Sequence, residues 1–166
     1  DKEAALITML KTLPTLAQVE ALVASDAAGT AATLASTEAT LESIRQQMDA
    51  LQLNMNGDEQ AAFTARLTEQ TPEGMHNYTD LTAYFAQRHT QQLADVQAAI
   101  DELPMVETVQ AMDVTAEDYA QRFSATETAT AAAQTLLTAY KATLSEANLA
   151  NLEALLGTPE TAESNG

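Results

Sequence analysis

The sequence predicts an all-α protein, arranged most economically as an antiparallel helical bundle of the four-helix type. Alanine is abundant while the chain has only five glycines and four prolines, a composition that favours helix over sheet. Apolar residues recur at alternating steps of three and four along three long segments, which is the spacing of helices that pack nearly parallel to their neighbours. No strand-like alternation of apolar and polar residues competes with this pattern.

The first third of the chain predicts a short helix and a long one. An apolar segment at residues 4–13, followed by Pro14, predicts the short helix. The three-and-four repeat then runs through residues 15–54. This segment forms either one long helix or two, because Gly29 and the short polar cluster beside it are its weak point.

A turn and the second long helix follow. Residues 54–60 predict a turn in which Gly57 takes a left-handed conformation and Asp58 caps a short helix. Thr71 suits the N-cap of the next helix, since Pro72 fits its first position. The next proline in the sequence is expected to end this helix, whose apolar side would contain Leu81, Phe85, Leu93, Val96, Ile100 and Leu103.

The third long helix is predicted after a short apolar segment at residues 105–112. Thr115 and Asp118 have the spacing of a capping box and would start it. Ser145 would then cap a last short helix that Gly157 ends. The third long helix carries the clearest repeat in the chain, which consists of Tyr119, Phe123, Thr126, Thr130, Ala133, Leu137, Tyr140 and Leu144.

Length and charge limit the possible organisation and partners. The chain has 166 residues, and we expect residues 1–157 to form a single helical-bundle domain and residues 158–166 a flexible polar tail. Its net charge is −17, from 24 acidic residues against seven Lys and Arg. Nucleic-acid binding needs clustered cations and is therefore not expected. The same charge repels anionic membrane surfaces, and we predict no membrane span within the chain.

Several classes of chemistry lack their residues or motifs. The chain has no cysteine, which excludes a disulfide, a thiolate metal site and a cysteine nucleophile. We find no glycine-rich phosphate loop, nucleophile elbow or HExxH motif, and so predict neither an enzyme nor a cofactor. The first residue is Asp1 rather than Met. We expect an exported protein, periplasmic or extracellular, whose leader has been removed, with a cytoplasmic protein as the alternative.

Residues 71–89 contain both histidines of the chain and raise the question of a metal site. Glu73, His76 and Asp80 are spaced by three and four, so a helix would place all three on one face, where they could hold a divalent metal. The helix start accounts for Glu73, however, and the other two are ordinary neighbours on a solvated helix face. We therefore predict no metal site.

The second histidine suggests a ligand site. His89 lies four residues after Phe85 and four before Leu93, on the apolar side of its helix, with Arg88 at the edge. A buried imidazole or guanidinium needs a partner, which is either a carboxylate on a neighbouring helix or the acidic group of a small ligand. The predicted ligand-binding residues, provided that the two helices meet there, are Tyr84, Arg88, His89, Tyr119 and Arg122.

Residues 142–156 resemble the closing motif of the Spy/CpxP family of periplasmic helical proteins. Leu144, Ser145 and Asn148 would stand for the Leu, Thr and Gln of that motif, and residues 15–18 keep part of an earlier copy. Both copies depart from the family pattern. The resemblance implies a small all-helical periplasmic chaperone or metal-stress sensor, which binds client proteins or metal.

We therefore predict a non-enzymatic, exported helical-bundle protein that binds a protein or a small-molecule ligand. One alternative is the extracytoplasmic ligand-binding sensor domain of a bacterial membrane receptor, since such domains are often helical bundles of this size. The chain could also be a periplasmic Spy/CpxP-like chaperone or a self-assembling surface subunit. In the latter, the apolar segments 4–13 and 149–156 would join copies into a homo-oligomer.

Overall fold

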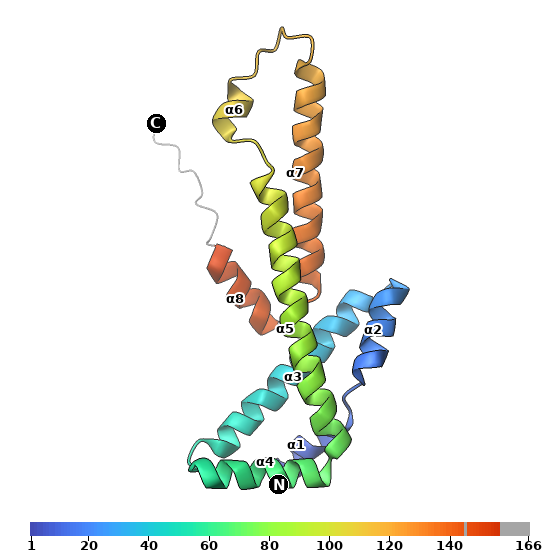
Figure 1. Ribbon diagram of the computed structural model, residues 1–166, viewed down its shortest axis with the longest axis vertical. Coiled ribbons are helices and arrows are strands. Elements are labelled where there is room, and N and C mark those ends of the chain that lie inside the picture. Colours follow the sequence, from blue (N-terminus) through green and yellow to red (C-terminus); the bar gives the residue numbers. More distant parts are fainter. Residues whose placement is uncertain (145, 157–166) are drawn as a thin grey trace. The chain divides into compact units, whose positions relative to one another are not determined.

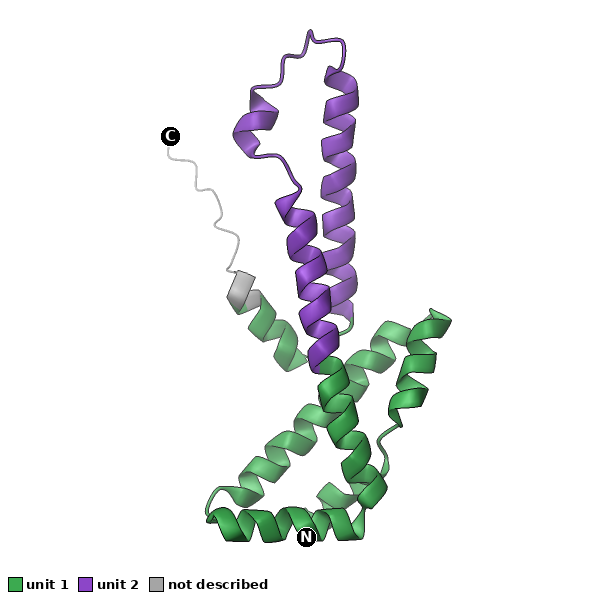
Figure 2. Cartoon of the chain, viewed as in Figure 1, with its two compact units in different colours: residues 1–85, 143–166 green, residues 86–142 purple. Residues whose placement is uncertain are grey.

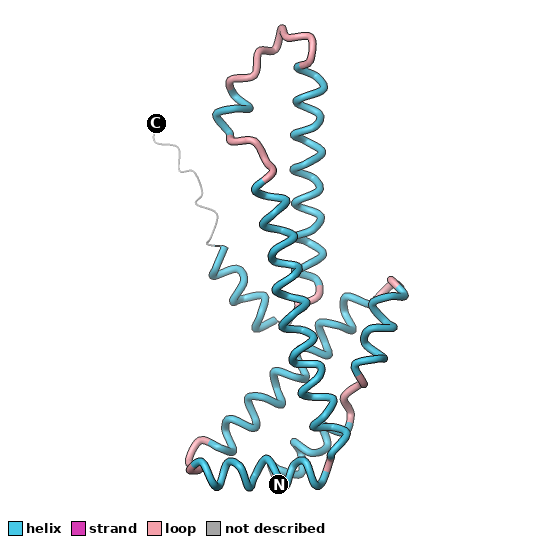
Figure 3. The backbone as a smooth tube through the Cα atoms, viewed as in Figure 1, coloured by secondary structure: helices cyan, strands magenta, loops and turns pink. Residues whose placement is uncertain are grey.

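The computed structural model describes residues 1–144 and 146–156, and every regular element in them is a helix, which confirms the all-α class (Figures 1 and 3). The predicted cap at Ser145, the helix end at Gly157 and the tail 158–166 lie outside the described residues. In chain order the elements are α1 (Lys2–Lys11), α2 (Leu16–Ser25), α3 (Thr30–Gln52), α4 (Gly57–Gln70), α5 (Pro72–Asp101), α6 (Val106–Gln110), α7 (Tyr119–Ala142) and α8 (Glu146–Leu156).

The helices divide into two compact units, which we describe separately (Figure 2). Unit 1 comprises residues 1–85 together with the C-terminal residues from Thr143, and unit 2 comprises residues 86–142. Helix α5 therefore belongs to unit 1 up to Phe85 and to unit 2 beyond it. The expectation that residues 1–157 form a single domain stays a prediction.

The repeat at residues 15–54 forms two helices, α2 and α3. Thr15 caps α2 in a reciprocal capping box with Gln18. Asp26 then takes a left-handed conformation with φ of 45°, and Gly29 does the same with φ of 88°. A helix cannot continue through left-handed residues, so the chain turns here and α3 starts at Thr30.

The start of α4 differs from the prediction. The Asn56 side chain accepts a hydrogen bond from the Glu59 N–H at 3.0 Å, and the Glu59 carboxylate accepts one from the Asn56 N–H at 2.8 Å. This reciprocal pair satisfies two N–H groups at the helix end. Gly57 is consequently the first helical residue rather than a left-handed one, and Asp58 is not the cap. Helix α5 begins at Pro72 as predicted.

Unit 1 holds the main hydrophobic core, and α3 is its central element. Helices α1, α2 and α8 each pack on α3. Each fully buried leucine or phenylalanine contributes about 1.5–3 kcal/mol relative to an exposed one. The predicted antiparallel four-helix arrangement is not confirmed. The buried apolar residues of this core are Leu6, Leu10, Leu13, Val19, Leu34, Leu41, Ile44, Phe63, Leu67, Leu81 and Phe85.

Unit 2 is a hairpin formed by the second part of α5 and by α7, which run antiparallel (Figure 2). The His89 and Tyr140 rings lie 5.7 Å apart between their centroids. One heptad further along each helix, Val96 and Ala133 are both buried. Ala133 and Tyr140 of the predicted α7 repeat are thus buried, whereas Phe123 of the same repeat is 38% exposed, because the interior between two helices is thin.

Two details of unit 2 correct the sequence-based expectations. The repeat predicts Leu93 and Ile100 on the buried side of α5, but they are 40% and 42% exposed. A single neighbouring helix covers only a narrow face of α5, so the outer part of the apolar stripe stays in water. Helix α7 begins at Tyr119 and not near Thr115, whose N–H and hydroxyl instead donate hydrogen bonds to the Asp113 carboxylate at 2.8 and 2.7 Å.

No helix among the described residues is both long and apolar enough to cross a membrane by itself. Helices α1 and α2 meet that criterion only when taken together, and they are bent by 49° at the break between them.

Candidate functional site

The predicted ligand-binding residues are distributed over both units. Tyr84 is half-buried in unit 1, where its ring meets the Phe85 ring edge-on at 5.6 Å. In unit 2, His89 lies against Tyr140, and Arg88 is half-buried. The Arg88 Nε and the Gln92 Oε1 are buried and have no hydrogen-bond partner among the described residues.

The other two predicted residues lie far from His89 along the hairpin. Tyr119 stacks on Phe123 at 5.8 Å and Arg122 is exposed, both at the beginning of α7. The His89 contact is with Tyr140, near the end of α7. Eighteen residues separate Arg122 from Tyr140, which corresponds to about 27 Å along a helix. The structure therefore does not bring Tyr119 and Arg122 to Arg88 and His89.

The histidine and carboxylates near the start of α5 form a simple surface pair. The His76 Nε2 lies 3.1 Å from the Asp80 Oδ2, and the His76 side chain is 74% exposed. Within the described parts of the chain, no three histidine or acidic side chains converge as metal ligands would. Glu73 lies in the first turn of α5, where the helix dipole favours an anion.

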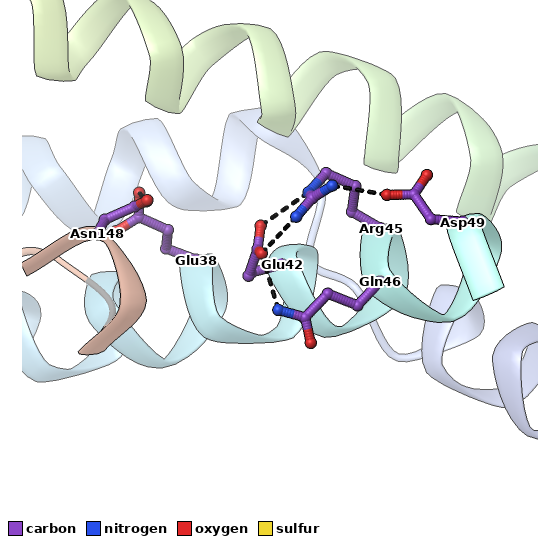
Figure 4. Close-up of polar contacts among 6 residues, drawn as sticks. All are labelled: Glu38, Glu42, Arg45, Gln46, Asp49 and Asn148. Carbon is purple, nitrogen blue, oxygen red and sulfur yellow. Dashed lines mark hydrogen bonds and ion pairs between the residues drawn. The ribbon is translucent and has the colours of Figure 1, made fainter. Parts of the chain in front are cut away.

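Helix α3 carries a polar network in unit 1 (Figure 4). The Arg45 guanidinium donates two hydrogen bonds to the Glu42 carboxylate, at 2.7 and 3.0 Å, and a third to Asp49 at 2.6 Å. The Gln46 amide also donates to Glu42. The hydrogen bonds from Arg45 lower the pKa of the Glu42 carboxyl below its usual value. Of this network, Glu42 and Gln46 line a groove of about 420 Å³ between α3 and α8.

The pH dependence of this network gives a first testable prediction. Because the pKa of Glu42 is lower in the folded state, its contribution to stability is present above the unfolded pKa of about 4.5 and is lost as the pH falls through the folded value. We expect Glu42→Gln to reduce the free energy of unfolding at pH 7 and to have little effect at pH 3. Urea denaturation of both proteins at the two pH values measures the difference. In an Arg45→Gln background the effect of Glu42→Gln should depend less on pH. If Glu42→Gln reduces the free energy of unfolding as much at pH 3 as at pH 7, the assignment is contradicted.

A polar side chain also joins α8 to α3. The Asn148 Nδ2 donates a hydrogen bond of 2.6 Å to the Glu38 Oε1, across 110 positions of the sequence. Glu38 is a buried carboxylate, and Figure 4 shows the two side chains facing each other. In unit 1, Asn148 therefore helps to hold α8 on α3.

The sequence predicts only a short apolar segment at residues 105–112 between α5 and α7, without a functional role. The whole segment that links the two helices, residues 102–118, contains the short helix α6 and is hereafter called the connector. Met105, Val106 and Val114 in it are 75%, 65% and 71% exposed. The signal in the sequence was a mixture of apolar and acidic residues without the period of a helix or a strand, which identifies no secondary structure.

Comparison with protein-family models, with curated proteins and with solved structures finds no match to this chain. The resemblance of residues 142–156 to the Spy/CpxP family therefore stays a prediction.

Proposed function

We propose that this chain is a non-enzymatic interaction protein that uses unit 2 to bind another protein. The exposure of apolar side chains carries the proposal. Among the described residues, eight large apolar side chains are exposed, and all but Leu53 lie in unit 2. These seven residues are Leu93, Ile100, Met105, Val106, Val114, Phe123 and Leu136.

The hairpin has the physical properties of an interface. Exposed apolar area is unfavourable in water, and the packing of α7 on α5 leaves part of the apolar surface of unit 2 uncovered. The hairpin also contains a segment without charge. Residues 128–140 of α7 have no charged side chain, although the net charge of the whole chain is −17. The central parts of protein interfaces are depleted of charged residues in the same way.

Site-specific photo-crosslinking tests this function. A photoreactive residue placed at Leu136, on α7, should give a discrete protein adduct in cells of the source organism. The same residue at Leu53, which is 79% exposed in unit 1, should not. Adding unlabelled protein should suppress the adduct, whereas protein carrying Leu93→Ser and Leu136→Ser should suppress it at least tenfold less effectively. An adduct of twice the chain mass would identify a second copy as the partner.

Two results would contradict the proposal. Equal labelling at positions 53 and 136 would mean that unit 2 has no preferred role in binding. Equal suppression by the unlabelled wild type and by the double variant would mean that the exposed leucines do not contribute. The two substitutions of the double variant alter exposed side chains, so its far-ultraviolet circular dichroism should match that of the wild type.

A further inference from the structure

The connector is longer than the hairpin requires. Two antiparallel helices are commonly joined by about 2–8 residues. Here α5 ends at Asp101 and α7 begins at Tyr119, which leaves the 17 residues 102–118 between them. Long connections in compact proteins are commonly functional. We therefore expect the connector to have a role besides joining α5 to α7.

The connector combines exposed apolar side chains with a high density of negative charge. It contains Met105, Val106 and Val114, each more than half exposed. Its five acidic residues are Glu102, Glu107, Asp113, Glu117 and Asp118, and it has no Lys, Arg or His. This amounts to −5 over 17 residues, roughly three times the mean charge density of a chain with −17 over 166.

We propose that the connector binds a basic amphipathic segment of another protein. The inference rests on the proposed function and specifies the partner's chemistry. Apolar side chains of the partner would cover the exposed methionine and valines, and its Lys and Arg side chains would pair with the carboxylates of the connector. Methionine side chains adapt to partners of different shape, which suits a surface of this kind.

The charge of the connector argues against other occupants. A second copy would bring another five carboxylates to the same surface, and like charges brought together in this way repel. Nucleic acids and anionic lipid surfaces are repelled for the same reason. A basic protein segment is the class of partner that both neutralises the carboxylates and covers the apolar side chains.

Binding of designed peptides to the full chain tests the inference. The probe is a fluorescently labelled 16-residue peptide of lysine and leucine in which leucines recur with helical spacing. One control is a peptide of the same composition with that spacing scrambled, and another is an oligolysine of equal charge. Fluorescence anisotropy should show at least tenfold tighter binding of the amphipathic peptide than of either control. Its affinity should also fall as salt is added.

Two variants of the protein separate the apolar and electrostatic contributions. Met105→Ser/Val106→Ser/Val114→Ser should weaken binding of the amphipathic peptide at least tenfold. Serine at position 105 is also a favourable N-cap for α6, so the short helix should persist. The charge variant Glu102→Gln/Glu107→Gln/Glu117→Gln should weaken binding at least tenfold and reduce its dependence on salt.

Matched variants in unit 1 provide the controls. Leu53→Ser removes an apolar side chain that is at least as exposed, and Glu20→Gln/Asp26→Asn/Glu69→Gln removes three exposed acids. Each should change the affinity by less than twofold.

The outcomes distinguish failure of this inference from failure of the proposed function. Equal loss in the two charge variants would overturn the connector site in favour of general attraction to an acidic surface. Equal binding of oligolysine and of the amphipathic peptide would overturn the apolar contribution, and absence of peptide binding would overturn the inference as a whole. A specific adduct at Leu136 would still support unit 2 as an interaction surface in each of these cases.

Discussion

Replacing Gly74 by alanine is expected to destabilise the protein by about 1–3 kcal/mol, although alanine is the better helix former. Gly74 is buried near the start of α5. A Cβ atom at this position would lie 2.8 Å from the backbone carbonyl oxygen of Leu10 and would also overlap the Thr71 hydroxyl. The hydroxyl can rotate away, but the Leu10 carbonyl belongs to the backbone at the end of α1. The overlap therefore outweighs the gain in helix propensity of about 0.5–1 kcal/mol.

Gly57 provides the matched control for this substitution. It is also helical, at the start of α4, but a Cβ there would have no atom within 4 Å. Gly57→Ala should therefore raise the free energy of unfolding by about 0.4–1 kcal/mol, because it restricts the unfolded chain without a steric cost. Urea denaturation of the two variants measures both changes. An increase in stability for both would contradict the close approach of α1 to α5.

The helices themselves could be predicted because their signals are local. The three-and-four repeat placed Leu41 and Phe85 on buried faces, and both are buried in the structure. Thr71 and Pro72 correctly placed the start of α5. The packing around Gly74 could not be predicted, because it depends on a carbonyl group that lies more than sixty residues earlier in the chain.

The stripe on α5 shows where periodicity stops being informative. Phe85 and Leu93 both belong to the predicted apolar side of α5, yet Phe85 is buried in unit 1 and Leu93 is exposed in unit 2. Periodicity states which side of a helix is apolar but not how many neighbours cover it. Which apolar residues of α5 are buried, such as Val96, and which are exposed, such as Leu93, therefore depends on the tertiary arrangement.

The candidate site was predictable only in part, for a related reason. The spacing of His89 correctly placed it on the side of α5 that faces another helix, where it meets Tyr140. Helical spacing contains no information on the register of two antiparallel helices, and that register leaves Arg122 about 27 Å along α7 from Tyr140. The connector was recognised only as a short apolar segment, because it lacks the period from which a helix or strand is predicted.

Replacing Asn148 by alanine is expected to cost about 1–3 kcal/mol, because the buried Glu38 carboxylate loses a hydrogen-bond donor that water cannot readily replace. Asn151 lies one turn further along α8 and is exposed. Asn151→Ala should therefore change the stability by less than about 0.5 kcal/mol. Urea denaturation measures both effects, and hydrogen exchange of the α8 amides shows whether α8 is the element that loosens.

A double-mutant cycle determines whether the loss comes from the pair. The double variant Glu38→Leu/Asn148→Ala removes both polar groups of the pair, so it should lose less stability than the sum of the losses in Glu38→Leu and Asn148→Ala. Additive losses would show that Glu38 and Asn148 stabilise the fold independently. Coupled losses would mean that α8 is held on α3 by a specific polar contact, which apolar packing alone does not provide because it fixes no single orientation of the two helices.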